Sequence, residues 1–472
     1  MTLSLKEVLT LDIEDCTAIT FDIIIVGSGA CGGAAAISLA EKNLNILIIE
    51  AGPLLLTEHV GSLSLRYNPP LIKKLSEKSS SQALWQDNTQ RLNREQVWTV
   101  AGGKTLFWGG HSPRFREEEF NKWPIEKDLL QDCYCWAEDF LHINKNFFAN
   151  QTQSELIKSS QEQGLTIEPA SLALEDNGNP STLPNMIYSS IHTILAHSQY
   201  TVNLNQTGIH LACDAKALKI QHQNKRIKGI EVKNMVNGEK CLIKARHYIL
   251  ACGAMRSNQL VLHSLLETPA FLTGQYLSEH LFCKGLIRLS TPLTEPVYLH
   301  VPAQREKPYL FEIHGPLNQT WYDNNHATIW LDWIKNQSYL LLYGFGVAEI
   351  IQENKVTLHS EEPGYKVYYN HTITDHNTMK EMHDSAKKIA KSLNGSLEKI
   401  EFQPPGSSYH ERGGLLMGSH PKHSVVNDKG RFWNYENLYC MDSAIWPSQD
   451  AANSCLTITA LTRYLTCRFM NF

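Results

Sequence analysis

Residues 21–50 carry the pattern that most restricts how this 472-residue chain can fold. Two short apolar runs, residues 21–26 and 45–49, have the length and composition of strands that are buried on both faces. The alanine-rich interval between them has the composition and length of a helix. The segment is therefore predicted to form a βαβ unit.

Three glycines after the first run, Gly27, Gly29 and Gly32, have the spacing of a dinucleotide-binding fingerprint. In such a turn the first glycine allows a tight bend, the second lets the backbone approach a pyrophosphate, and the third permits close packing of helix on strand. Glu50, at the end of the second run, is placed to accept the ribose hydroxyl. The spacing predicts a dinucleotide site but does not separate FAD from a nicotinamide cofactor.

Further segments narrow the cofactor. Residues 248–260 are predicted to form a strand followed by Gly–Ala and a helix start, residues 102–113 form a glycine-rich loop, and residues 437–442 form a late strand that ends in an acid. With the opening motif, and with residues 274–281 and 353–358, they resemble in order the glucose–methanol–choline family of FAD oxidoreductases. The resemblance implies an α/β FAD-binding domain (Rossmann-like, of the glutathione-reductase type) interleaved with an α+β substrate domain that contains an antiparallel sheet.

The end of the chain carries a base-capable histidine, His410, and an asparagine 43 residues later, Asn453. A neutral histidine can take a hydroxyl proton near pH 7, whereas asparagine does not titrate and can hold the hydroxyl by hydrogen bonding. The resemblance implies that His410 is the catalytic base and that Asn453 occupies a position that holds either His or Asn. Residues 456–462 are predicted to be helical, with a first turn near Ser454 and Cys455 that presents a positive dipole end to the reduced flavin.

The resemblance also assigns the surroundings of the cofactor. Residues 102–105 match the loop that passes the flavin and its diphosphate, and residues 214–217 match the strand whose backbone meets the adenine. Asp442 and Ser443 match the strand end near the ribityl and diphosphate groups. The complete set of expected cofactor contacts is Gly27, Gly29, Ala30, Gly32, Glu50, Gly102, Gly103, Lys104, Thr105, Ala217, Cys252, Gly253, Asp442, Ser443, Ser454 and Cys455.

The chain departs from the family pattern at several positions. Ser454 and Cys455 stand where relatives usually have Pro and Thr, and Asp450 stands where a glycine is usual. Asp450 is interpreted as a cap of the terminal helix, with tuning of the flavin as the alternative. Phe107 stands where some sugar-oxidising relatives carry a histidine that joins covalently to the flavin, so non-covalent FAD is expected.

Other histidines lie near the motifs. His111, His280, His420 and His423 are interpreted as structural or as supporting the site. The pair His410-Glu411 lacks the second histidine that a zinc protease motif requires, and no metal site is expected.

Composition and charge limit the partners. A net charge of −5 disfavours a nucleic-acid or polybasic membrane role. No apolar run approaches the ~18 residues that span a bilayer, and the first 20 residues lack the basic start and apolar core of a signal peptide. Eleven cysteines without a CxxC pair suggest reduced thiols. We therefore expect a cytoplasmic enzyme with a small-molecule alcohol or sugar substrate.

The predicted domains are interleaved along the chain. Residues 1–120, 200–285 and 406–472 are expected to form the FAD-binding domain, and residues 121–199 and 286–405 the substrate-binding domain that covers the flavin face.

Four shorter segments are also assigned from local pattern. Residues 76–82 and 175–184 are the best loop candidates, the second read as a surface loop with a lid as the alternative. Residues 320–322 and 329–333 alternate as strands do, and most of their rings are expected to pack in a core rather than to meet a ring-shaped substrate.

Three functions remain open. The first is an FAD-dependent oxidoreductase that oxidises a CH–OH group of a sugar, polyol or other alcohol, including a natural-product tailoring oxidase, by proton abstraction at His410 and hydride transfer to flavin N5. The second is a non-redox or photochemical member of the family, of lyase or decarboxylase type. The third is a nicotinamide-dependent dehydrogenase or binding protein. The ordered motifs favour the first, with oxygen, a quinone or a protein as the electron acceptor.

Overall fold

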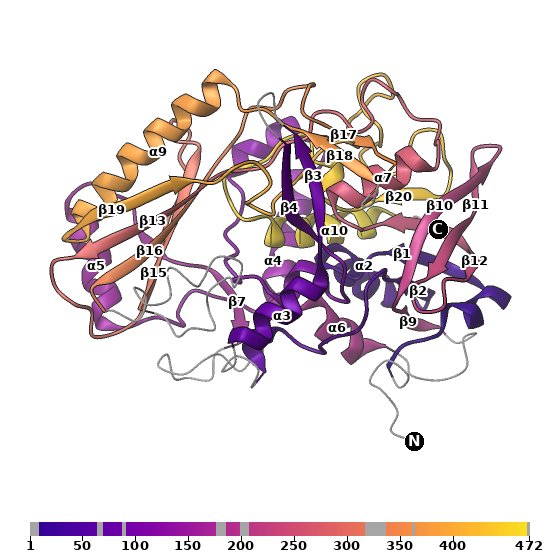
Figure 1. Ribbon diagram of the computed structural model, residues 1–472, viewed down its shortest axis with the longest axis horizontal. Coiled ribbons are helices and arrows are strands. Elements are labelled where there is room, and N and C mark those ends of the chain that lie inside the picture. The colour runs from indigo at the N-terminus through magenta and orange to yellow at the C-terminus, as the bar shows by residue number, and fades with distance from the viewer. Residues whose placement is uncertain are drawn as a thin grey trace.

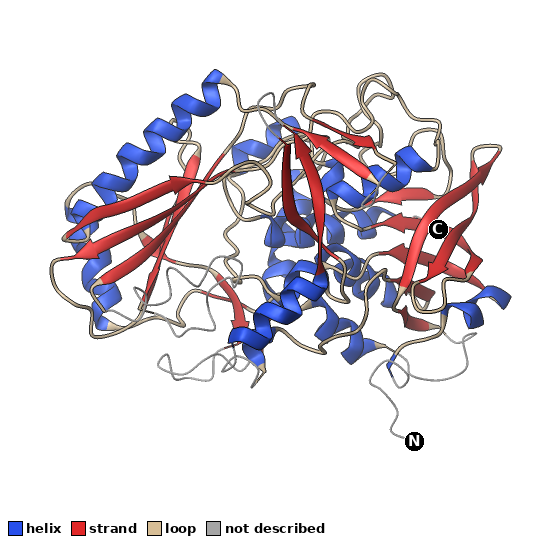
Figure 2. Ribbon diagram, in the orientation of Figure 1, coloured by secondary structure: helices blue, strands red, loops and turns tan. Residues whose placement is uncertain are grey.

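Two large β-sheets of different kinds dominate the fold (Figures 1 and 2). The computed structural model describes residues 9–63, 69–86, 91–175, 186–198, 207–316, 337–360 and 364–469. A sheet with a parallel core lies at one end of the molecule, and a six-stranded antiparallel sheet lies at the other (Figure 1). The chain crosses between the two ends several times, so each sheet is built from distant parts of the sequence.

The parallel core joins the start, middle and end of the chain. Its order is β20 (Leu438–Cys440), β12 (Lys240–Leu250), β1 (Thr20–Val26), β2 (Asn45–Ile49) and β9 (Gly208–Ala212). The last four residues of β1 and of β2 are buried, as expected for strands covered on both faces. The first part of β12 pairs instead with antiparallel β11 (Arg226–Asn234), which pairs with β10 (Ala215–Gln223).

Helices cover this sheet. The helix α2 (Ala30–Ala40) follows β1 and packs against α6 (Ser190–His197) and α10 (Ser454–Phe469). The helix α10 also packs against α4 (Lys127–Phe140), and α7 (Ala254–His263) follows β12. The predicted βαβ unit, the strand before α7, the late strand β20 and the terminal helix are all confirmed.

None of the helices within the described residues has the length and apolar character that a bilayer crossing requires.

The two faces of the antiparallel sheet have different neighbours. Its order is β19 (Gly395–Phe402), β13 (Leu281–Leu289), β16 (Tyr339–Gly346), β15 (Tyr309–Gly315), β14 (Val297–Val301) and β6 (Glu168–Pro169). One face packs on α9 (Ile373–Ser392) and α5 (Gln151–Glu162) (Figure 1). On this face Phe311 and Ile313 join a buried apolar cluster with residues of α9. Successive side chains of a strand point to opposite faces, so Glu312 and His314 point away from α9.

The sheet bears on the expected division into domains. Strand β6 comes from the interval 121–199 and the other strands from residues 281–402, so both expected substrate intervals contribute to it. The helices α4 and α6 of the first interval pack instead against helices beside the parallel core. The domain boundaries themselves stay a prediction.

Two small sheets complete the described structure. One has the order β17 (Lys355–Leu358), β18 (Tyr365–Tyr368), β3 (Ser80–Gln86) and β4 (Arg91–Trp98), and the other has β5 (Ile143–Asn144), β7 (Leu172–Glu175) and β8 (Met186–Ile187). Short 3₁₀ helices occupy Ile13–Ala18, Val60–Ser62, Gly103–Leu106, Glu117–Lys122 and Ser443–Ile445.

One loop prediction is wrong. Residues 76–82 form the end of α3 (Pro69–Ser79) and the start of β3. The serines at this junction suggested a loop, but Ser79 Oγ donates to the carbonyl oxygen of Leu75 and stays within the last helical turn. Residues 176–184 of the second loop candidate lie outside the described residues, and so do residues 320–322 and 329–333.

The turn from β1 into α2 depends on close backbone contacts. Gly27 has a φ of +103°, and a Cβ there would lie 2.6 Å from the carbonyl oxygen of Ala251. A Cβ on Gly32 would lie 1.9 Å from the carbonyl oxygen of Gly27. A Cβ on Gly29 would have no other atom within 4 Å. The first and third glycines therefore close the turn, and the second faces open space.

Replacing Gly32 by alanine should therefore destabilise the fold itself. We expect Gly32→Ala to cost about 3 kcal/mol, because the added methyl group must displace backbone. Gly29→Ala is the matched control and should cost about 1 kcal/mol or less. Thermal unfolding of the cofactor-free proteins measures both, and equal melting temperatures for the two variants would contradict this packing.

Candidate active site

A cavity of about 1320 Å³ extends from the β1–α2 turn to the face of the antiparallel sheet that carries Glu312 and His314. Pockets for single small molecules usually measure about 300–1,000 Å³, so this cavity has room for a dinucleotide together with a substrate. Its walls come from the start, middle and end of the chain: the glycine-rich loop, β10, the start of α7, the segment around His410 and the start of α10 all contribute.

Most of the residues expected from the sequence line this one cavity. The exceptions are Gly32, Gly102 and Asp442, which are not part of its wall. Gly102 donates its N–H to Ser28 Oγ (3.0 Å), and Asp442 accepts from the Gly253 N–H (2.9 Å) and Ser257 Oγ (2.5 Å). The lining residues are His410, Asn453, Gly27, Gly29, Ala30, Glu50, Gly103, Lys104, Thr105, Ala217, Cys252, Gly253, Ser443, Ser454 and Cys455.

Glu50 has the hydrogen-bonding capacity that a ribose contact requires. Its Oε2 accepts from the N–H and the Oγ of Ser28 (3.1 and 2.7 Å), and its Oε1 accepts from the Gly52 N–H (2.8 Å). Burial raises the pKa of Glu50, while the hydrogen bonds from Ser28 and Gly52 oppose this effect. Glu50 also lines the cavity, where a carboxylate can accept a hydroxyl group. Together with the open space at Gly29, this carboxylate fits a bound dinucleotide.

Lys104 ties the glycine-rich loop to the segment that carries His410. Its Nζ donates to Glu411 Oε2 (2.6 Å) and to the carbonyl oxygen of Tyr409 (2.7 Å). The lysine is 40% exposed, whereas Glu411 is buried, so this contact also supplies a counter-charge to a desolvated carboxylate.

His410 lines the same cavity as Glu50. Its Nδ1 is 3.0 Å from Nδ1 of His280, and its carbonyl oxygen accepts from Gln449 Nε2 (3.1 Å). Its ring lies beside Phe345, with 5.4 Å between the ring centroids. Burial, followed by the charges of His280 and Lys104, lowers the pKa of His410 well below its ordinary value. The imidazole is therefore neutral near pH 7, which is the form that can accept a proton.

A buried carboxylate that the sequence did not indicate, Glu312 of β15, orients Asn453. Glu312 Oε1 accepts from Asn453 Nδ2 (2.9 Å) and lies 2.8 Å from His111 Nδ1, and its Oε2 accepts from the Tyr298 hydroxyl (2.9 Å). His111 Nδ1 also lies 3.1 Å from Asn453 Oδ1. Burial alone would raise the pKa of Glu312, but His111, His314 and Asn453 lower it to about 2.

The histidines near the motifs thus fall into two groups. His111 contacts Asn453, and His280 contacts His410. The interpretation that these two histidines support the site is in accord with this geometry. His420 and His423 are exposed and do not line the cavity. For Glu312 the available signal was an acid inside an apolar strand with a histidine two residues later, which places both on one face.

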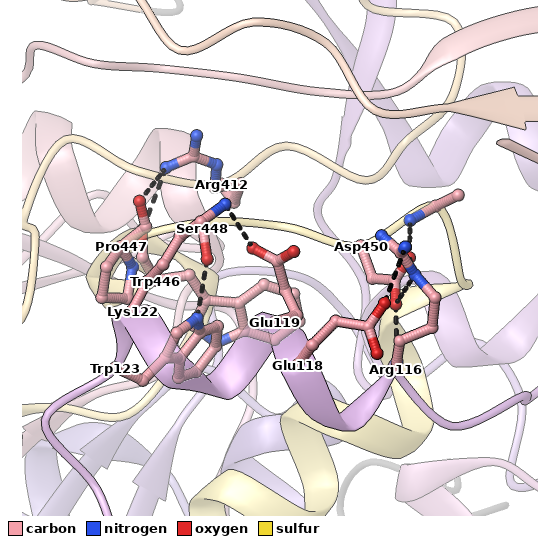
Figure 3. Close-up of polar contacts among 11 residues, drawn as sticks. Arg116, Glu118, Glu119, Lys122, Trp123, Arg412, Trp446, Pro447, Ser448 and Asp450 are labelled. Carbon is pink, nitrogen blue, oxygen red and sulfur yellow. Dashed lines mark hydrogen bonds and ion pairs between the residues drawn. The ribbon is translucent and has the colours of Figure 1, made fainter. Parts of the chain in front are cut away.

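The loop before α10 is held by contacts to the rest of the protein (Figure 3). Asp450 is 1% exposed, and its carboxylate accepts from the backbone N–H of Arg116 (2.5 Å) and from Arg116 Nε (3.1 Å). The interpretation of Asp450 as the helix cap is wrong, because α10 begins at Ser454 and the carboxylate is engaged by Arg116 and by the N–H of Ala451.

Two further contacts fix the same loop (Figure 3). The buried Arg412 donates from Nη1 to the carbonyl oxygen of Trp446 (3.0 Å), and Trp123 Nε1 donates to Ser448 Oγ (2.8 Å). With the Arg116–Asp450 pair they hold the chain at Trp446, Ser448 and Asp450, just before Asn453.

Glu312→Gln should destabilise the protein most strongly near neutral pH. An amide keeps one acceptor oxygen but removes the negative charge beside His111 and His314, at a cost of about 3 kcal/mol. Because folding lowers the pKa of Glu312 from 4.5 to about 2, its stabilisation is present above pH 4.5 and is lost as the pH falls toward 2.

Urea unfolding at several pH values measures this difference. The deficit of Glu312→Gln relative to the wild type should narrow below pH 4.5. Glu168→Gln, at a 47% exposed side chain of the same sheet, is the control and should change stability by about 0.5 kcal/mol or less. A deficit that does not depend on pH would show that Glu312 is not an ionised acceptor.

Comparison with known proteins identifies the family. Two GMC oxidoreductase models match residues 21–282 and 351–462. The chain is 22% identical to the 6'''-hydroxyparomomycin C oxidase of Streptomyces lividus over 93% of this chain and 89% of the relative. It is 21% identical to the pyranose 2-oxidase of Tricholoma matsutake over 77% of this chain and 71% of the relative.

A solved structure has the same fold. The crystal structure of pyridoxine 4-oxidase from Mesorbium loti matches with a TM-score of 0.70 and 14% identity, over 95% of this chain and 99% of that chain. The resemblance seen in the ordered motifs is therefore confirmed. The chain belongs to the GMC oxidoreductases, a family of flavoproteins, and is an oxidoreductase acting on alcohol or sugar CH–OH groups.

Proposed function

We propose that this protein is an FAD-dependent oxidoreductase that oxidises a sugar, polyol or other alcohol, with His410 as the proton acceptor and Asn453 as its partner. The observation that carries this proposal is the position of both side chains in the wall of the same cavity that the nucleotide fingerprint enters. Bound FAD would supply the hydride acceptor at flavin N5, and the protein would supply binding, orientation and proton transfer.

The residues that would hold FAD follow the wall of the cavity. Gly29 and Ala30, at the start of α2, would face the diphosphate, and Glu50 would accept the ribose hydroxyl. Ala217 of β10 would meet the adenine. Ser454, at the start of α10, would bring backbone N–H groups and the positive end of the helix dipole to the flavin.

His410 and Asn453 would divide the work on the substrate hydroxyl. Neutral His410 can take the hydroxyl proton. Because its pKa is lowered well below 6.5, the ring stays neutral near pH 7. Asn453 donates one amide hydrogen to Glu312, so its second amide hydrogen can hold the hydroxyl oxygen. The Glu312 contact thus orients the donor before substrate arrives.

The substrate end of the cavity suits a ring that bears several hydroxyl groups. Phe282 and Phe345 of the antiparallel sheet offer flat apolar surface there, and Glu312 offers a polar group on the same face. Two relatives are named as oxidases of pyranose and of 6'''-hydroxyparomomycin C. We therefore favour a sugar, or a natural product that contains one, over a simple aliphatic alcohol.

Replacing His410 by alanine should remove proton acceptance and leave cofactor binding intact. We expect His410→Ala to slow substrate-driven flavin reduction by roughly 10²-fold or more. In the wild type the rate should decline only well below pH 6.5, because the lowered pKa delays protonation of the base. Anaerobic stopped-flow absorbance measures both.

The control for this variant is an exposed histidine far from the cavity. His376→Ala, on α9, should reduce at the wild-type rate. If His410→Ala also keeps that rate while FAD content is unchanged, His410 is not the base.

The flavin should dissociate from the denatured protein. Phe107 lines the cavity and lies beside Trp98, with 4.7 Å between the ring centroids, and a phenyl ring cannot form a covalent bond to flavin. Acid precipitation should therefore leave the yellow chromophore in the supernatant, where chromatography identifies it as FAD. Colour that stays with the precipitated chain would contradict non-covalent binding.

A further inference from the structure

His280 lies between the base candidate and a backbone carbonyl group. It immediately precedes β13 and is 2% exposed. Its Nε2 lies 2.7 Å from the carbonyl oxygen of Asp450, and its Nδ1 lies 3.0 Å from Nδ1 of His410. These two contacts join three chain segments in a single row of hydrogen bonds: the start of β13, the loop before α10 and the segment that carries His410.

The hydrogens of this row can be assigned by donor and acceptor chemistry. A carbonyl oxygen only accepts, so His280 Nε2 must carry a hydrogen. Burial lowers the pKa of His280 to about 4, so the ring is neutral near pH 7 and its Nδ1 has a lone pair. A hydrogen bond between the two Nδ1 atoms then requires that His410 Nδ1 be the donor.

This assignment decides which atom of His410 can act as a base. A neutral imidazole carries one hydrogen, and for His410 it lies on Nδ1. Its Nε2 therefore keeps a lone pair, and it has no hydrogen bond to any residue in the part of the chain that the structure describes. Because Nδ1 is turned to His280 and the ring lines the cavity, Nε2 is the ring nitrogen left for a substrate hydroxyl.

We propose that His280 is a positioning residue that fixes the tautomer of His410, so that Nε2 is the proton acceptor. The inference rests on the proposed role of His410. When a substrate O–H bond breaks, the proton forms the Nε2–H bond, and His410 keeps its Nδ1–H bond to the lone pair of His280. No proton needs to pass to His280.

The far end of the row is anchored. The carbonyl group that accepts from His280 belongs to Asp450, whose carboxylate is held by the backbone N–H and Nε of Arg116 (Figure 3). The buried ion pair keeps this residue in place, so its carbonyl oxygen stays in line with His280. Two substitutions of His280 can separate the hydrogen-bond acceptor at its Nδ1 from the volume of its ring.

The tautomer can be measured directly by nitrogen NMR. In FAD-loaded protein labelled with ¹⁵N-histidine, the His410 signals are assigned by their loss in His410→Gln. We expect a protonated Nδ1 and an unprotonated Nε2, which have well-separated chemical shifts. The opposite pattern in the wild type, with Nε2 protonated, would overturn the proposal without any variant being made.

The two variants test whether His280 is the cause. His280→Leu removes the acceptor, so the two His410 nitrogens should move toward averaged shifts, and flavin reduction should slow roughly 10- to 100-fold with little change in KM. His280→Asn keeps an acceptor oxygen near the place of Nδ1 and should restore most of the tautomer and of the rate. FAD content and melting temperature check that both variants are folded.

These outcomes separate the inference from the proposed function. If His280→Leu folds and leaves the His410 tautomer unchanged, His280 does not fix it. If the tautomer is as expected but His410→Ala reduces as fast as the wild type, the role of His410 as base fails while the hydrogen-bond assignment stands. If His280→Leu does not fold, the wild-type spectrum and His280→Asn still decide the tautomer.

Discussion

The parallel pairing of β1 with β12 is the contact on which the rest of the site depends. It aligns the carboxyl ends of strands from the start and middle of the chain, and β20 adds the end of the chain to the same edge. The turn at Gly27 is packed against Ala251, which directly follows β12. In open sheets of this kind ligands bind at the carboxyl ends of the strands. The buried strands therefore determine where a dinucleotide can lie, and every other part of the cavity is placed relative to that edge.

The antiparallel sheet contributes the opposite wall by simple alternation. Phe311 and Ile313 bury their side chains against α9, and the residues between and after them turn a carboxylate and an imidazole toward the cavity. A buried charge is tolerated only when it is paired and hydrogen-bonded. Glu312 meets that condition with a histidine, an amide and a phenol. One set of contacts thus stabilises the charge and orients Asn453.

Features set by local sequence could be predicted, and features set by the meeting of distant segments could not. The βαβ unit, the glycine turn and the terminal helix follow from neighbouring residues, and the family resemblance located His410 and Asn453. Glu312 joins His111 and Asn453, which are 342 residues apart, and no local pattern links them. The sequence suggested two roles for Asp450, and neither was its ion pair with Arg116, which lies 334 residues away in the chain. Residues 76–82 were misassigned because serines suit both a loop and a helix end.

We propose that substrate hydride reaches a flavin bound in this cavity. The most direct test is anaerobic mixing of the purified, flavin-loaded protein with a panel of sugars, polyols and primary and secondary alcohols, followed by the absorbance of oxidised flavin at about 450 nm. At least one sugar-like member of the panel should bleach the flavin, and admission of air then shows whether oxygen is the acceptor. A protein that purifies without flavin and binds none, or a flavin that dithionite bleaches but no alcohol in the panel does, would contradict this proposal.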